Sequence, residues 1–149
     1  ARLHETLVNN LRFAAHELSQ EGIALLVEPI NTRDMPGFFL SSTGQALSLL
    51  DDVDSANVFL QYDVYHMQVM EGDLARTIEA NLDRIAHIQI ADNPGRNEPG
   101  TGEIHYPAIA RALRDIGYDG TVGMEAYAAG DGATAAVAAY KYISTKSWN

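Results

Sequence analysis

Four short apolar runs recur along the chain, and each ends at or beside a side chain that carries an acceptor oxygen. The runs have the composition of buried β-strands and cover residues 23–28, 58–63, 86–91 and 120–125. Their acceptor side chains are, in chain order, Glu28, Asp63, Gln89 and Glu125. A carboxylate at the end of a buried strand is costly unless a positive charge offsets it. If the strands are parallel, the four side chains meet at one edge of a sheet, and a hard divalent cation is the expected occupant.

Helical patterns separate these four runs. The predicted helices cover residues 2–20, 42–50, 73–85, 107–117 and 133–143. The clearest helix starts are Ser42 and Asp73 as N-caps and Pro107 at a first helical position. Strands and helices that alternate at this spacing are typical of parallel strands joined by right-handed crossovers, so the predicted fold class is α/β.

Two α/β architectures fit this alternation: an open doubly wound sheet and part of a (β/α)8 TIM barrel. A dinucleotide-binding doubly wound sheet has a glycine-rich turn after its first strand, and none follows Val27 and Glu28. Functional groups at the ends of successive strands are typical of the barrel, which is usually about 250 residues long. The chain has 149 residues. We therefore expect residues 1–149 to form a single incomplete barrel domain, with the chain beginning inside the fold.

The balance of charge restricts the class of partner. Acidic residues outnumber basic ones 20 to 10, for a formal net charge of -10. This charge argues against nucleic acid or an anionic membrane as the main partner, because both bind basic surfaces. No apolar run approaches the roughly 20 residues of a membrane span. The chain has no cysteine, which excludes disulfide scaffolds and thiol chemistry and is compatible with a reducing compartment. We expect a cytoplasmic protein with a small-molecule partner.

The four acceptor side chains have a simpler interpretation when each is taken alone. A single carboxylate at a strand end often caps a neighbouring helix or faces solvent, but four acceptor side chains at four strand ends favour a shared site. The amide of Gln89 makes that site all-oxygen, which favours Mg²⁺ or Mn²⁺ over Zn²⁺. His87 shares a strand face with Gln89, and we expect it to be a buried core residue. Gly123 shares a face with Glu125 and is expected to leave room beside that carboxylate.

Two further residues are candidates for contact with a substrate. His66 follows Asp63 by three residues and suits donation of a proton or hydrogen bond to a substrate oxygen; the alternative is a loop residue that caps the next helix. Arg96 lies in a loop rich in Gly and Pro, where its guanidinium suits a bidentate contact with a substrate carboxylate. The alternative is an ordinary ion pair within the loop, with Glu98 or Asp92.

The segments that contain these residues resemble a known family. They are VEPIN (27–31), QYDVYHMQ (61–68), HIQIADNPGRNEPGTGEI (87–104) and GMEAY (123–127). They are similar to the xylose-isomerase-like TIM barrels and, within that family, to the hydroxypyruvate isomerases. The resemblance spans residues 20–128 and implies the C-terminal half of the barrel, with about strands 5 to 8. We therefore expect a homo-oligomer, or association with a missing N-terminal half.

The resemblance also implies roles for the site residues. It implies an isomerase that depends on Mg²⁺ or Mn²⁺ and uses no organic cofactor. The implied metal ligands are Glu28, Asp63, Gln89 and Glu125. Of these, Glu28 and Glu125 would also be the acid/base pair, and His66 and Arg96 would contact the substrate.

The implied reaction interconverts hydroxypyruvate and 2-hydroxy-3-oxopropanoate (tartronate semialdehyde) by proton transfer through an enediolate. Three alternatives remain open at this point: a 2-oxo-tetronate isomerase, a ketose 3-epimerase, and a half-barrel fragment without catalytic activity. The related epimerases usually have a histidine where Gln89 stands. The related endonuclease IV has a zinc cluster rich in histidine, and the five scattered histidines of this chain do not support that function.

Overall fold

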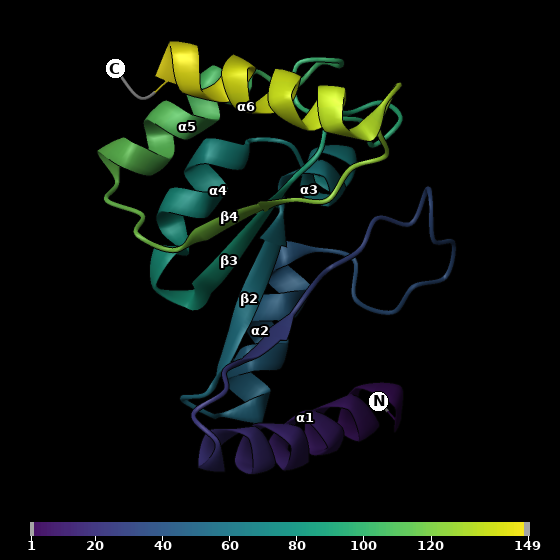
Figure 1. Cartoon of the computed structure of the whole chain (residues 1–149). Helices are drawn as coiled ribbons and strands as arrows, with labels where there is room; N and C mark the ends of the chain where they lie inside the picture. The colour runs from purple at the N-terminus through teal and green to yellow at the C-terminus, as the bar shows by residue number, and fades with distance from the viewer. Residues whose placement is uncertain (1, 148–149) are drawn as a thin grey trace.

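The structure is a computed structural model that describes residues 2–147, with side chains as far as Ser144. The helices are α1 (Arg2–Gln20), α2 (Thr43–Val53), α3 (Val64–Met70), α4 (Leu74–Ala80), α5 (Tyr106–Asp115) and α6 (Gly132–Ser147), with a 3₁₀ turn η1 (Leu82–Arg84). The strands are β1 (Leu25–Val27), β2 (Val58–Asp63), β3 (Ile85–Ile90) and β4 (Thr121–Met124). The four strands form one parallel sheet in the order β1-β2-β3-β4 (Figure 1). This order confirms the predicted α/β fold.

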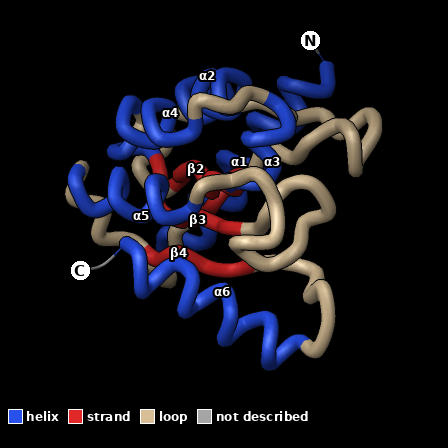
Figure 2. Tube along the Cα trace, turned by 90° about the horizontal axis from the view of Figure 1, so that it is seen from above, coloured by secondary structure: helices blue, strands red, loops and turns tan. Residues whose placement is uncertain are grey.

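One face of the sheet is buried under helices, and the other is only half-buried. Leu60, Tyr62 and Ile88 point to the covered face, and their side chains are 0% exposed. Seen from above, α2, α4, α5 and α6 lie around the strands (Figure 2). Gln61 and His87, which alternate with these buried residues, are half-buried on the opposite face. The apolar core therefore lies between the sheet and its helices, and the polar side chains of the strands gather on the other side.

The predicted helix starts have different outcomes. Ser42 is the N-cap of α2, and its side chain accepts a hydrogen bond from the backbone N–H of Gln45. Pro107 lies in the first turn of α5, where its missing N–H has no cost. Asp73 is the N-cap of α4, as predicted, but it does not cap the helix through its side chain. This residue precedes α4 in a left-handed conformation, and its side chain makes no capping hydrogen bond.

Helix α3 is the element that the sequence pattern did not indicate. It begins directly after β2, so His66 lies on a helix and not in a loop. Asp63 is the N-cap: its Oδ1 accepts from the backbone N–H of Tyr65 at 2.8 Å and of His66 at 3.3 Å. A helix of seven residues is too short to show a clear apolar period. Its start was hidden because the capping residue also ends a strand.

The strand ends place three of the four predicted acceptor residues just where each strand stops. Glu28 follows β1 by one residue, Asp63 is the last residue of β2, and Glu125 follows β4 by one residue. The backbone N–H of Glu125 still donates to the carbonyl of Ile90 at 3.2 Å, so pairing continues past the strand end. Gln89 lies inside β3, one residue before its end. All four therefore lie at the same edge of the parallel sheet.

No helix in the described part of the chain combines the length and apolar character that a bilayer crossing requires.

Candidate active site

Glu28, Asp63 and His66 form a compact cluster at this edge of the sheet. One ligand atom from each residue lies within 4.8 Å of the others. Among the described residues, no other group of three His or acidic side chains meets this distance. His66 Nε2 is 3.8 Å from Glu28 Oε1 and 3.7 Å from Asp63 Oδ2. Both distances exceed a normal hydrogen bond. The three ligand atoms therefore lie close enough together for one ligand atom to be near all of them.

Glu28 fits a cation better than any other charged residue of the site. Its Oε1 is buried and has no hydrogen-bond partner, while Oε2 accepts from Gln61 Nε2 at 2.8 Å. Burial raises the pKa of Glu28 to about 7, and the negative charges of Asp63 and Glu125 add to the increase. A buried carboxylate oxygen without a partner is rare in proteins, and a hard divalent cation is a suitable partner for it. The cluster of Glu28, Asp63 and His66 thus fits a metal ion.

Gln61 is a site residue that the sequence analysis did not identify. Its Nε2 donates to Glu28 Oε2 at 2.8 Å and also to Gln89 Oε1 at 2.7 Å. One amide therefore ties together two of the predicted metal ligands. The available signal was its position two residues before Asp63, which places both side chains on the same face of β2.

Glu125 and Arg96 are paired at the edge of the cluster. Arg96 Nη2 lies 2.6 Å from Glu125 Oε2 and 3.4 Å from Asp63 Oδ2. The alternative ion pair within the loop is therefore wrong, because Arg96 contacts neither Glu98 nor Asp92 among the ion pairs of the described residues. Glu125 is 57% exposed at its side chain and lies outside the compact cluster. Arg96 Nε is buried and has no hydrogen-bond partner among the described residues.

The loop that carries Arg96 is held by the buried carboxylate of Asp92. Asp92 Oδ1 accepts from the backbone N–H groups of Asn93 and Ile104, and Oδ2 accepts from that of Gly100. Arg96 itself adopts a left-handed conformation with φ 56°. The loop therefore presents this side chain from a fixed backbone, as a binding residue requires.

His66 is 2% exposed and is held from behind by the loop that follows β1. Its Nδ1 lies 2.7 Å from Asn31 Nδ2 and 3.4 Å from the backbone nitrogen of the same residue. Burial is the main cause that lowers the pKa of His66 below its ordinary value. Asn31 was not among the predicted site residues, although it belongs to the VEPIN segment directly after the first strand.

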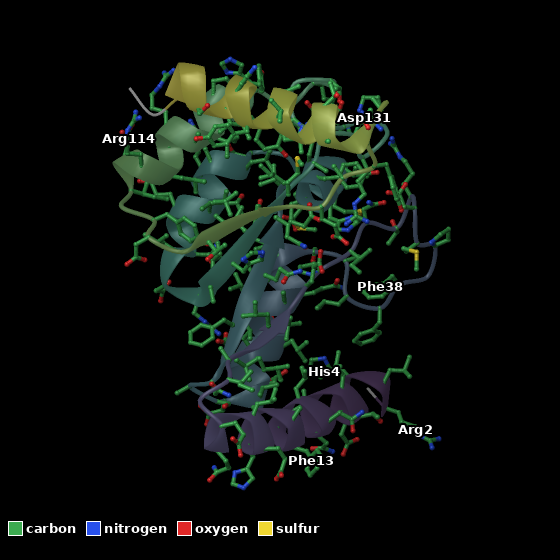
Figure 3. The ribbon with its side chains drawn as sticks, in the orientation of Figure 1. Arg2, His4, Phe13, Phe38, Arg114 and Asp131 are labelled. Carbon is green, nitrogen blue, oxygen red and sulfur yellow. The ribbon has the colours of Figure 1, made fainter. Side chains whose placement is uncertain are left out.

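The hydroxyl of Tyr65 also lies in this loop network, because it donates to the Asp34 carboxylate. That hydrogen bond is the main cause that lowers the pKa of Asp34. The guanidinium carbon of Arg96 lies 5.6 Å from the centre of the Tyr65 ring, a cation–π contact. Farther along the same loop, Phe38 is exposed on the part that projects from the sheet (Figure 3).

Two predictions about the half-buried face of the sheet are wrong. His87 is half-buried and is not a fully buried core residue. A Cβ at Gly123 would lie 3.0 Å from His87 Nε2, so the glycine makes room for this histidine and not for Glu125.

Comparison with known proteins identifies the family of this chain. The sequence profile described as "Xylose isomerase-like TIM barrel" matches residues 2–145. Hydroxypyruvate isomerase of Escherichia coli (strain K12) is 54% identical over 124 residues, covering 83% of this chain and 48% of that protein. The 2-oxo-tetronate isomerase of Cupriavidus necator is 43% identical over 125 residues, covering 84% of this chain and 48% of that protein.

The chain is also similar to proteins of known structure. The crystal structure of an AP endonuclease, family 2, from Brucella melitensis superposes with a TM-score of 0.86 at 43% identity, covering 89% of this chain and 51% of that one. The chain thus spans about half the length of the relatives that it matches. The strand-end cluster, the four parallel strands and the matching profile together show that this chain belongs to the xylose isomerase-like TIM barrel family.

Proposed function

We propose that this chain carries the ligand-binding half of an isomerase that depends on a divalent metal and acts on a short hydroxy-oxo acid. The proposed reaction interconverts hydroxypyruvate and 2-hydroxy-3-oxopropanoate. The observation that carries the proposal is the cluster of Glu28, Asp63 and His66, with a buried oxygen of Glu28 that lacks a partner. The 54% identity to a hydroxypyruvate isomerase supports this choice of substrate.

The proposed metal is Mg²⁺ or Mn²⁺, because the acceptors at the strand ends are oxygen atoms. The residues that would hold it are Glu28, Asp63, Gln89 and Glu125. Such a cation, when bound, acts as a Lewis acid and stabilises the negative charge that develops on the substrate oxygens.

The proposed reaction moves one proton between adjacent carbons. One glutamate, Glu28 or Glu125, accepts a proton from C3 of hydroxypyruvate, and the other delivers a proton to C2. The hydroxyl proton on O3 passes to O2, and His66 suits this transfer because it lies between the carboxylates of the cluster. No atoms are gained or lost, as an isomerisation requires. Without a bound cation, burial raises the pKa of Glu28 to about 7.

Arg96 is the proposed binding group for the substrate carboxylate. Its side chain is 19% exposed and already lies beside Asp63 and Glu125, and its buried Nε has no hydrogen-bond partner among the described residues. A guanidinium binds a carboxylate through two parallel hydrogen bonds. Arg96 would therefore select acids over neutral sugars, which separates the proposed reaction from that of a ketose epimerase.

We further propose that a second unit covers the open edges of the sheet. Within the described strands, β1 and β4 each pair on one side only. An apolar groove also runs along β4, α5 and α6, and it leaves Val122 37% exposed and Met124 43% exposed. Unpaired sheet edges invite further strands. Either the other half of a family barrel or a second copy of this chain would cover them.

Three measurements test these proposals. In an assembly with a complete barrel, EDTA should abolish the isomerisation and Mg²⁺ or Mn²⁺ should restore it; full activity in EDTA would contradict the metal. Four-carbon 2-oxo acids belong in the substrate panel, because the 43% identity to a 2-oxo-tetronate isomerase makes them the second candidate. Light scattering on the purified chain should find dimers or larger species if a second copy covers the sheet edges, and a stable monomer would exclude that occupant.

A further inference from the structure

Two hydrogen-bond donors, both from Asn31, face Nδ1 of the His66 ring. Asn31 Nδ2 lies 2.7 Å from Nδ1, and the backbone N–H of Asn31 approaches the same atom at 3.4 Å. The backbone group is a donor in every circumstance. Both side chains are fully enclosed, with Asn31 0% exposed and His66 2% exposed, so water does not replace these contacts.

The side-chain amide of Asn31 has one orientation that satisfies its neighbours. Its Oδ1 accepts from the backbone N–H of Arg33 at 3.1 Å and from that of Asp34 at 2.8 Å. Its Nδ2 donates to Asp34 Oδ2 at 3.0 Å, in addition to the contact with His66. A flipped amide would set its NH₂ group against two backbone N–H groups and its oxygen against a carboxylate. The group that faces His66 is therefore a donor.

Two donors at Nδ1 require that this nitrogen carry no proton. The neutral ring then carries its proton on Nε2, the nitrogen that faces Glu28 Oε1 at 3.8 Å and Asp63 Oδ2 at 3.7 Å. A histidine that binds a metal usually has the opposite arrangement: it donates from its second nitrogen to a carboxylate or a carbonyl, and the first nitrogen is free for the metal. The contacts of Asn31 oppose that arrangement.

We propose that Asn31 is a positioning residue that holds His66 in the Nε2–H tautomer, so that His66 presents a hydrogen-bond donor, and not a metal ligand, to the cluster. His66 lies among the side chains close enough to hold an ion, but its protonated Nε2 has no lone pair to offer. The cation then depends on the oxygen ligands alone. The Nε2–H can then donate a hydrogen bond to an oxygen atom of a bound ligand. This role does not depend on the proposed reaction, because it applies to any ligand with an oxygen atom at this position.

The tautomer is directly measurable in the unmodified chain. Long-range ¹H–¹⁵N spectra of the labelled chain in EDTA distinguish a protonated from an unprotonated ring nitrogen. The signals of His66 are identified among those of the five histidines by their loss in His66→Gln. We expect an unprotonated Nδ1 and a protonated Nε2. A protonated Nδ1 in the wild-type chain would overturn the proposal without any further variant.

An exchange variant tests whether Asn31 is the cause. The double substitution Asn31→Asp with Asp34→Asn swaps the amide and the carboxylate, so it leaves the net charge unchanged and allows residue 34 to donate to residue 31. The carboxylate at position 31 then accepts a charge-assisted hydrogen bond from Nδ1–H, which outweighs the long backbone contact at 3.4 Å, and Nε2 becomes free. We expect the proton of His66 to move to Nδ1 and the affinity for Zn²⁺, which favours imidazole, to rise about 10- to 100-fold.

The matched control is Asp34→Asn alone. It changes the same neighbour of Asn31 but keeps the donor that faces Nδ1, so it should retain the Nε2–H tautomer and should not gain the higher Zn²⁺ affinity. An exchange variant that keeps the wild-type tautomer, or a control that loses it, would show that Asn31 does not set the state of His66.

Discussion

Arg96 Nη2 lies 2.6 Å from Glu125 Oε2, which pairs the proposed substrate-binding base with a proposed metal ligand. A cation held by Glu125 would therefore compete with the guanidinium of Arg96 for the same carboxylate. A cation that takes this oxygen would release Arg96 to bind the substrate. The ion pair thus links the two binding functions of the site.

Substitution of Arg96 should separate these two functions. Arg96→Gln removes charge-assisted hydrogen bonds worth about 1.5–3 kcal/mol each, so KM for the acid substrate should rise about 10- to 100-fold. The affinity for Mg²⁺ should not fall, because the same change removes a competing positive charge. Steady-state kinetics and calorimetric titration measure the two effects. Arg84→Gln, which removes a surface ion pair with Asp51, is the control and should change neither.

The two proposed proton-transfer residues should be equally indispensable. Glu28→Gln and Glu125→Gln keep the shape of each side chain but remove the carboxylate, so each should reduce kcat by at least about 100-fold. Glu79→Gln, an exposed change on α4, should have no effect on the rate. Near-normal turnover by either of the first two variants would exclude the scheme with two glutamates.

Burial of Glu28 should make metal binding depend on pH. The pKa of Glu28 is raised from 4.5 to about 7, so the folded chain keeps a proton that the unfolded chain has lost between these values. The contribution to stability is therefore complete below pH 4.5 and is lost as pH rises through about 7. Because a cation needs the ionised carboxylate, the affinity for Mg²⁺ should rise with pH up to about 7 and binding should release a proton.

Calorimetric titrations in buffers with different enthalpies of ionisation count the released protons. Glu28→Gln is the informative comparison, because it retains the volume of the side chain and cannot ionise. Its unfolding stability in EDTA should lack the decline between pH 4.5 and 7 that the wild type shows. An identical pH dependence in the two chains would assign the effect to another group.

Gln61 should matter for the metal although it is not a proposed ligand. Gln61→Leu removes the amide that holds both Glu28 and Gln89, so the affinity for Mg²⁺ should fall about 10- to 100-fold, the range typical of residues that orient metal ligands. Gln20→Leu, on the exposed surface of α1, is the control. Equal affinities for the two variants would indicate that the bridge has no role in metal binding.

The loop that carries Arg96 should tolerate no side chain at Gly102. A Cβ there would overlap the carbonyl oxygen of Asn93 and lie 2.5 Å from Asp92 Oδ1, so the backbone must shift. Gly102→Ala should lower the free energy of unfolding by about 1–3 kcal/mol. Gly44→Ala in helix α2 meets no atom within 4 Å and should instead stabilise by about 0.5–1 kcal/mol. Urea denaturation of the two variants measures this difference in sign.

The fold was predictable because it depends on local patterns. The four apolar runs became four parallel strands, and Ser42 and Pro107 began the helices that they indicated. Helix α3 was missed because one residue, Asp63, both ends β2 and caps the helix. The strand ends also brought Glu28 and Asp63 together, since parallel strands place their carboxyl ends at one edge.

The sequence by itself determined the fold class and the acceptor side chains at the strand ends, because periodicity and strand direction act over a few residues. The tertiary structure decided which side chains make hydrogen bonds to the residues of the site. Gln61 reaches Glu28 because β1 pairs with β2 in the register Val27 to Leu60, and Asn31 reaches His66 because α3 packs behind the loop after β1. These partners lie 33 and 35 residues apart. A hydrogen bond over that separation depends on register and packing, which no local pattern specifies.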